Sequence, residues 1–172
     1  MAAPGKSCGS CGLCCKLLRI EALDKPAGPW CARFKPGAGC TIYDDRPGDC
    51  RTFECDWLGS PGLPEAWRPD RSRMILIAGD DGLRVIVDPA TPAAWRREPY
   101  YGHLKRMAGR IPEGGQLIVS VGERRIVLFP DQDIDLGVVP ADARIVSGYA
   151  VQGGRRTPYA RMVRDPGPPL PG

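Results

Sequence analysis

The placement of cysteine constrains this chain more than any other feature of its sequence. All eight cysteines lie within the first 55 of 172 residues, and none follows. An even scatter would spread them over the whole length, so the clustering indicates an N-terminal unit with its own chemistry. The eight residues are Cys8, Cys11, Cys14, Cys15, Cys31, Cys40, Cys50 and Cys55.

The spacing of the first cysteines favours metal ligation. Cys8, Cys11 and Cys14 are separated by two residues each, a spacing at which a tight turn presents sulfurs to one centre. Side chains of adjacent residues diverge, so Cys14 and Cys15 serve either two nearby centres or one centre and the packing beneath it. Eight thiols can form two four-thiolate sites, or one four-iron cluster with four cysteines left over. Both zinc and an iron–sulfur cluster accept thiolates alone, and the spacing leaves the pairing open.

Two other uses of the cysteines are less favoured. A disulfide scaffold needs an oxidising compartment, whereas the first seven residues contain no apolar stretch of the kind found in a secretory signal. Inert buried thiols would not require the regular spacing. No apolar run reaches the roughly 20 residues of a membrane helix. The sequence therefore predicts reduced, metal-binding thiolates in a cytoplasmic protein.

Net charge gives little support for nucleic-acid binding. The formal charge of +4 counts every cysteine as neutral, but coordinating thiols are deprotonated, and two four-thiolate sites would bring the charge near zero. The best basic patch holds Arg155, Arg156, Arg161 and Arg164, with only Tyr159 as an interleaved aromatic residue. The expected partner is a metal ion, an unidentified protein partner stays open, and neither membrane nor nucleic acid is expected.

The pattern of the whole chain predicts an α+β protein. Residues 1–60 are expected to form an irregular cysteine-rich metal-binding module with short helices, packed on a small antiparallel sheet within residues 61–165. A Pro/Gly tail, 166–172, is expected to be disordered. A broken helix should begin at Thr91-Pro92, stop at Pro99 and resume up to Gly109. Glycine turns and apolar runs predict three hairpins, 74–78 with 83–87, 116–121 with 125–129, and 143–151 with 159–163.

Catalytic signals are absent from this sequence. His103, the one histidine, lies among aromatic residues and is predicted to be a packing or surface residue. Asp131, Asp133 and Asp135 alternate as in a calcium loop but lack its glycine and distal glutamate, so turn chemistry is the better interpretation. No phosphate-binding loop or nucleophile elbow is present. No catalytic residue is assigned, and enzymatic activity stays open.

The residues around the cysteines resemble a known family. Its signature is matched by Cys8-x-x-Cys11-Gly-x-Cys14-Cys15-Lys16, Trp30-Cys31, Cys40-Thr-Ile-Tyr43, Arg46-Pro47 and Cys50-Arg-Thr-Phe53-Glu-Cys55. Over residues 8–57 this text resembles the CxxCxxCC family of zinc- or iron-chelating proteins, the YkgJ-type cysteine-cluster family. The resemblance implies that all eight cysteines bind zinc or an iron–sulfur cluster. The family also includes the much larger flagellin lysine N-methylases.

Three functions follow in order of preference. The first is metal binding, with a structural or storage role. The second is an iron–sulfur redox or sensor protein, and the third is a protein-modifying enzyme distantly related to the N-methylases. Lys16, Arg19 and Arg51 are predicted to offset thiolate charge, and Phe53 and Trp57 to shield the metal. For Arg46 two roles stay open, a hydrogen bond to a carboxylate or carbonyl group and simple solvation.

Overall fold

The computed structural model describes residues 2–164. The N-terminal part is built from short pieces separated by loops, as predicted: helices α1 (Leu13–Leu17), α2 (Gly48–Thr52) and α3 (Asp56–Gly59), the 3-10 turn η1 (Glu21–Leu23), and the two-residue strands β1 (Phe34–Lys35) and β2 (Gly39–Cys40). The rest contains η2 (Glu65–Trp67), α4 (Pro69–Ser72), η3 (Ala94–Arg96), α5 (Tyr100–Ala108), β3 (Met74–Gly79), β4 (Gly82–Val87), β5 (Gln116–Val121), β6 (Arg124–Leu128), β7 (Asp133–Val138), β8 (Ala143–Gln152) and β9 (Arg155–Arg164). The predicted α+β class is confirmed.

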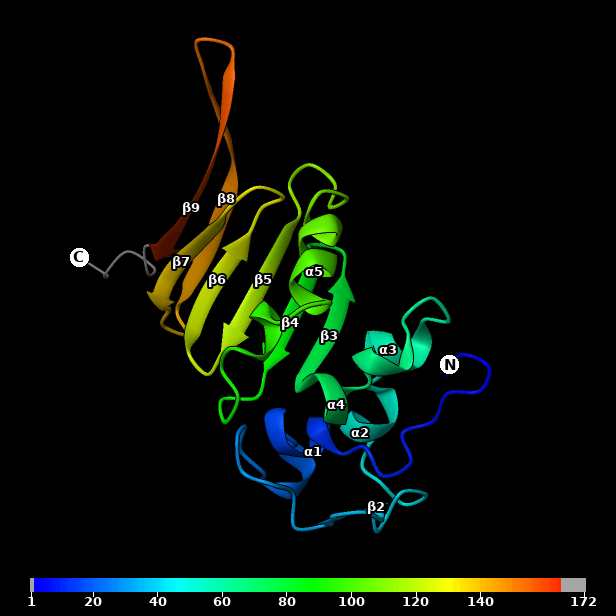
Figure 1. Cartoon of the computed structure of the whole chain (residues 1–172). Coiled ribbons are helices and arrows are strands. Elements are labelled where there is room, and N and C mark those ends of the chain that lie inside the picture. The colour runs from blue at the N-terminus through cyan, green and yellow to red at the C-terminus, as the bar shows by residue number, and fades with distance from the viewer. Residues whose placement is uncertain (1, 165–172) are drawn as a thin grey trace, which may run out of the picture.

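Five strands form the central sheet, in the order β3-β4-β5-β6-β7 (Figure 1). The predicted hairpins β3–β4 and β5–β6 are confirmed, and their turns use Gly82 and Gly122 at positive φ, a conformation that suits glycine. The sheet is not wholly antiparallel as predicted, because β4 and β5 pair in parallel, with Val85 opposite Val119. The segment carrying η3 and α5 supplies the crossover connection that a parallel pair requires.

The main hydrophobic core lies between one face of this sheet and α5. Leu76, Val85 and Val119 from three neighbouring strands are buried there together with Trp67 and Trp95. The predicted broken helix is a 3-10 turn, η3, followed by α5, which starts directly after Pro99. His103 packs its ring against Trp67 at 5.1 Å between centroids, the packing role predicted for it.

The opposite face of the sheet receives the cysteine-bearing segment. Leu13 and Leu17 from α1 are buried against Ile75 on β3, with Ile77 and Ile86 beside them. Figure 1 shows the segment below the sheet, near the start of β3. Trp57 and Leu58 of α3 join the main core. The predicted boundary near residue 60 stays a prediction, since side chains from both sides of it share one core.

The prediction that the alternating aspartates belong to a turn is wrong for Asp133 and Asp135. Asp133 and Asp135 lie in a strand paired with β6, not in a turn. Asp133 accepts hydrogen bonds from Tyr101 Oη at 3.0 Å and Lys105 Nζ at 2.9 Å, and Asp135 forms a bidentate pair with Arg124. The alternation therefore belongs to a strand whose acidic side chains are held by basic and phenolic partners from β6 and α5.

The third predicted hairpin is the longest element of the fold. β8 and β9 pair over their whole length, from Ala143 with Arg164 to Gln152 with Arg155, around the turn Gly153-Gly154. Figure 1 shows this two-stranded ribbon extending well beyond the central sheet. The predicted disordered tail, 166–172, lies outside the described residues. Within residues 2–164, no helix combines the length and apolar character needed to cross a membrane.

Candidate metal centre

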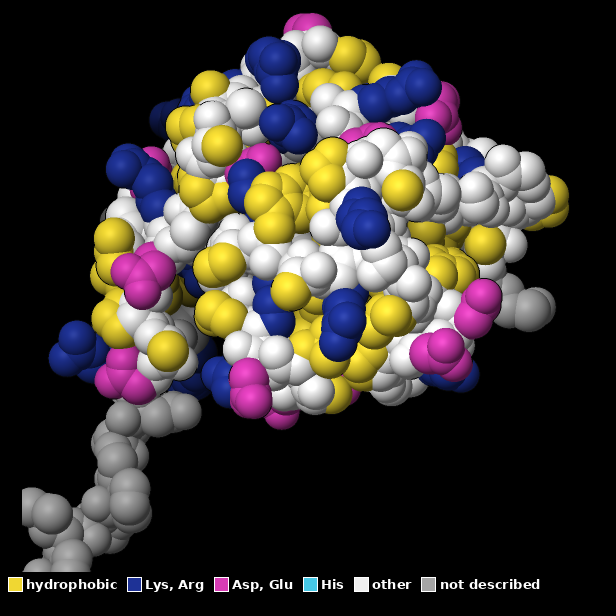
Figure 2. All heavy atoms as spheres, turned by 90° about the horizontal axis from the view of Figure 1, so that it is seen from below, with side chains coloured by type: hydrophobic (Ala, Val, Ile, Leu, Met, Phe, Trp, Pro, Cys, Tyr) yellow, Lys and Arg dark blue, Asp and Glu magenta, His cyan; other side chains and the backbone are white. Residues whose placement is uncertain are grey.

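Seven of the eight cysteines line one pocket of about 240 Å³, the exception being Cys31, which is buried. All eight are free thiols. The wall of the pocket also contains Phe53, Trp57 and Ile75, with Arg19, Arg46 and Arg51 among its polar residues. Figure 2 shows the underside of the molecule, where hydrophobic side chains, the class in which cysteine is coloured, gather between Lys and Arg side chains. The chain thus brings together residues up to 47 positions apart, from Cys8 to Cys55.

Short local structures present the cysteines. A turn closed by the Cys11 amide, which donates to the Cys8 carbonyl at 2.8 Å, precedes α1 with Cys14 and Cys15. Cys31 is tied to α1 because its amide donates to the Cys15 carbonyl at 2.9 Å. The remaining three occupy β2, α2 and the residue before α3, namely Cys40, Cys50 and Cys55.

The causes of the pKa shifts indicate which thiols lie near one another. The pKa of Cys50 is raised by burial and then by Cys15, Cys31 and Cys40. The pKa of Cys55 is raised by burial and, among the thiols, by Cys11 and Cys8. Cys14 also feels Cys11 and Cys8. We name two sets of four on this basis, the first thiol set (Cys8, Cys11, Cys14, Cys55) and the second thiol set (Cys15, Cys31, Cys40, Cys50).

Cys14 and Cys15 connect the two sets. A hydrogen bond between their side chains raises the pKa of Cys14 and lowers that of Cys15 to about 7. Burial raises both, and the Lys25 ammonium further lowers that of Cys15. The lowered pKa and the nearby Lys25 ammonium both favour the thiolate form of Cys15.

Lys25 is a functional candidate that the sequence pattern did not reveal. The residue is only 7% exposed, and its ammonium group donates to the carbonyl oxygens of Lys16 at 2.7 Å and Leu18 at 2.5 Å. Burial lowers its pKa, while Cys31 and Cys15, followed by Cys14 and Cys50, raise it. A buried ammonium that pairs with no carboxylate in residues 2–164 is costly unless negative charge lies nearby, and the sulfurs of Cys31 and Cys15 are the groups beside it that can carry such a charge.

The cations predicted to balance the thiolates have mixed roles. Lys16 instead pairs with buried Asp88 at 2.7 Å, at the end of β4. Arg51 lines the pocket and also stabilises the turn before α2, because its Nη2 donates a hydrogen bond to the Asp44 carbonyl at 2.6 Å. The open question about Arg46 is answered, since it donates to the carbonyl oxygens of Cys50 and Tyr43 at 3.2 and 3.0 Å.

Two glycines let the cysteine loops approach closely. A Cβ at Gly12 would overlap the ring of Phe34, and one at Gly39 would overlap the carbonyl oxygen of Gly9. Gly39 also has a φ of +85°. The strand bearing Cys40 thus lies directly on the loop between Cys8 and Cys11.

Gly39→Ala is therefore expected to separate these two loops, and if the cysteines bind metal, the amount of bound metal should fall at least several-fold. Gly37→Ala is the matched control, because Gly37 also has positive φ, +78°, but has open space around its Cβ position. Both variants carry the backbone strain of alanine at positive φ, and only Gly39→Ala adds the overlap. Equal metal contents in the two purified proteins would contradict this role of Gly39.

The donor set fits a thiolate-bound metal, whereas the side-chain arrangement is not closed around one point. No group of three or more Cys, His, Asp or Glu within residues 2–164 is arranged as a metal ion would need. Seven cysteines in one cation-flanked pocket, with Cys31 buried outside its lining, nevertheless match the chemistry of zinc and iron–sulfur sites, which require deprotonated sulfur ligands.

Comparisons with known proteins identify no relative of this chain. It matches no protein-family model, and neither a curated protein nor a solved structure shows significant similarity to it. The site must therefore be interpreted from its own residues.

Proposed function

We propose that this protein binds metal, as zinc or an iron–sulfur cluster, through its eight cysteine thiolates. In this proposal each thiol set supplies four ligands, and adjacent Cys14 and Cys15 belong to different sets. The family suggested by the sequence, the CxxCxxCC zinc- or iron-chelating proteins, agrees with this function. The metal would supply the cross-links that hold the loops of the segment together.

The observation that carries the proposal is the missing core of the cysteine segment. Between Ile20 and Trp57, Cys31 is the one buried hydrophobic residue. Chain segments of this length cannot offset their conformational entropy without burying apolar surface. Small modules of this kind obtain their stability from disulfides or metals, and all eight cysteines here are free thiols.

Charge supports the same function. Lys25 is buried beside Cys15 and Cys31, and a thiolate site stabilises a cation that would otherwise be costly in that position. We further propose a cytoplasmic location, because the reducing conditions there keep thiols available for metals.

The metal content of cysteine variants tests the proposal. Protein purified without oxygen should contain metal, and Cys11→Ser should remove the portion held by the first thiol set, as Cys50→Ser should for the second. Each single variant should therefore lose about half of the metal, and the double variant nearly all. Ser10→Ala, beside Cys11, is a control that should lose none. Metal-free wild-type protein, or unchanged content in both cysteine variants, would refute the proposal.

The absorption spectrum separates the two kinds of metal centre. Thiolate-to-iron charge transfer gives a brown protein with absorption at roughly 400 nm. Zinc has no such transition, so stoichiometric zinc in a colourless protein would assign closed structural sites. The iron–sulfur redox or sensor function would follow only from the first result.

A further inference from the structure

The ribbon formed by β8 and β9 is an exposed element of one charge sign. Residues 143–164 contain five arginines and no aspartate or glutamate. All five are exposed, and within residues 2–164 no carboxylate forms an ion pair with Arg155, Arg156 or Arg161. Figure 1 shows that the distal part of the ribbon has no neighbouring element on either face. Arg155, Arg156 and Arg161 therefore have no acidic partner within the described part of the chain.

The register places the charges on defined faces. Residues that pair directly share a face, and the face alternates along each strand. Arg155 pairs with Gln152, Tyr159 with Gly148, and Arg161 with Val146, so these groups lie on one face. Arg144 lies on the same face, opposite Val163. Three of the five arginines therefore line one side of the ribbon, and the side chains between them are those of Gln152, Ala150, Thr157, Tyr159, Val146 and Val163.

The base of the ribbon is fixed to the central sheet. Gln116 Nε2 on β5 donates to the Ile145 carbonyl at 3.1 Å, and the rings of Phe129 and Tyr149 meet at 5.3 Å. β9 also lies beside β7 (Figure 1). The ribbon is thus held at one end and presented outward, a geometry suited to inserting it into a groove.

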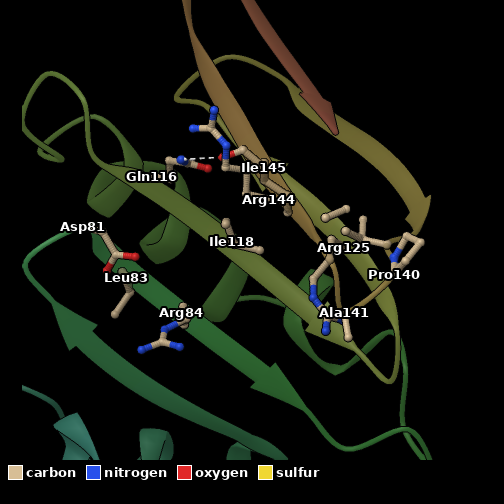
Figure 3. A pocket seen from close by; sticks show the side chains of 12 residues that line it. Asp81, Leu83, Arg84, Gln116, Ile118, Arg125, Pro140, Ala141, Arg144 and Ile145 are labelled. Carbon is tan, nitrogen blue, oxygen red and sulfur yellow. Dashed lines mark hydrogen bonds between the residues drawn. The ribbon is translucent and has the colours of Figure 1, made fainter. Parts of the chain in front are cut away.

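A second basic surface adjoins this base. A pocket of about 330 Å³ lies between β8 and the sheet face of β4, β5 and β6. Figure 3 shows Arg84, Arg125 and Arg144 among its lining side chains, with Asp81 as the acidic residue at one end. Burial lowers the pKa of Arg125, so this guanidinium would gain from a nearby anion. Positive charge thus continues from the ribbon to its base.

We infer that the ribbon is a docking arm for double-stranded DNA. A two-stranded ribbon fits the B-form major groove, which is about 12 Å wide, and arginine is the side chain best suited to phosphates and base edges. The three residue pairs beyond Tyr149, from Ala150 with Thr157 to Gln152 with Arg155, project by about 10 Å, close to the roughly 8.5 Å depth of that groove. The deep, narrow major groove of A-form RNA does not admit such a ribbon.

The structure favours this partner over two others. Binding to a single strand relies on aromatic rings available for stacking, but Tyr149 is engaged by Phe129 and by Arg156, whose guanidinium lies 4.6 Å from the ring. Tyr159 lies against Gly148. An arm that enters a lipid surface needs apolar residues at its leading end, whereas the turn here is Gln152-Gly153-Gly154-Arg155. The sequence alone did not favour nucleic acid because the shared face of Arg144, Arg155 and Arg161 becomes visible only in the strand register.

Fluorescence anisotropy with a labelled 20-base-pair DNA duplex tests the inference on the full-length protein as purified. At physiological salt the wild-type protein should bind with a Kd on the order of 1–100 µM, typical of non-specific contacts, and more tightly at low salt. Replacing Arg155, Arg156 and Arg161 together by alanine should weaken binding at least ten-fold. The slope of log affinity against log salt should fall by about 2, since each lost phosphate contact removes about 0.9 and Arg156, opposite Val151, lies on the other face of the ribbon from Arg155 and Arg161.

Two variants keep the test decisive. Alanine at Arg97, Arg106 and Arg110, three exposed arginines around α5, changes the net charge equally and should leave affinity within about two-fold. Lysine at the three ribbon positions keeps the charge and should restore most binding, even where the alanine variant fails to fold. Equal weakening by both alanine sets, preference for a 20-nucleotide single strand or a 20-base-pair RNA duplex, or binding only to phosphatidylserine vesicles would overturn the inference. These DNA-binding results do not depend on whether the cysteines bind metal, so the two proposals can fail separately.

Discussion

Removing the metal is expected to unfold residues 21–56 while the central sheet stays folded. In the proposed state the metal replaces the missing core of this segment, in which Cys31 is the one buried hydrophobic residue. Binding energies of structural zinc sites are about 10–16 kcal/mol, far more than this segment's few apolar contacts supply. The sheet has its own core, with Met74, Val85 and Val119 at 0% exposure.

Hydrogen exchange measured by mass spectrometry resolves the two regions. After treatment with a strong chelator and a reductant, peptides covering residues 21–56 should exchange within seconds, while peptides from β3 to β6 should keep their protection. Returning the metal should restore the protection of the first region, which separates metal loss from irreversible damage. Protection of residues 21–56 that survives complete metal removal would show that the segment is stable by itself.

The hairpins could be predicted from the sequence because their signals are local. The turns at Gly82, Gly122 and Gly153-Gly154 each lie between apolar or β-branched runs, and the strand pairs on either side form as expected. The parallel pairing of β4 with β5 could not be predicted in this way. The parallel pairing depends on how the intervening η3 and α5 pack over one face of the sheet. Tertiary contacts, not local sequence, decide that packing.

The same distinction applies to charged residues. The aspartates of β7 looked like turn residues because Lys105, Tyr101 and Arg124, which hold them, are distant in sequence. Lys25 carried no local signal either, since its burial depends on the fold of α1 around it. The eight cysteines were recognisable as one cluster from their spacing, whereas the proposal that they form two sets of four rests on which thiols lie near one another in the fold.

Lys16→Met is expected to destabilise the protein by about 3–5 kcal/mol, the cost of leaving a buried charge without its partner. Lys16 Nζ lies 2.7 Å from Asp88 Oδ1, and the Asp88 side chain has 0% exposure. The second carboxylate oxygen of Asp88 has no hydrogen-bond partner in residues 2–164. This pair joins α1, the helix with Cys14 and Cys15, to the end of β4, so losing it should also loosen the cysteine segment.

Arg19→Met is the matched control, because it removes a cation three residues further along the chain whose ion pair is exposed. Arg19 pairs with Glu21 at 3.6 Å, but both side chains are more than two-thirds exposed, at 72% and 78%. Exposed pairs contribute less than about 1 kcal/mol, so this variant should unfold in urea almost like the wild type. Similar losses in both variants would show that the Lys16 effect is not specific to the buried pair.

A second substitution and the pH dependence identify the mechanism. Adding Asp88→Asn to Lys16→Met removes the orphaned charge and should recover more than half of the loss, a coupling that a double-mutant cycle measures.

In the wild type, burial raises the pKa of Asp88, but the hydrogen bonds from Lys16 and the Ala90 amide outweigh it and hold the pKa below its ordinary 3.8. The stabilisation is therefore complete above that value and is lost as the pH falls through the lowered pKa. In Lys16→Met the carboxyl takes up its proton at higher pH, so the stability difference from the wild type should shrink as the medium becomes acidic. A difference that stays constant from pH 7 to pH 3 would mean that Lys16 acts through packing of its alkyl chain, without the charge of Asp88.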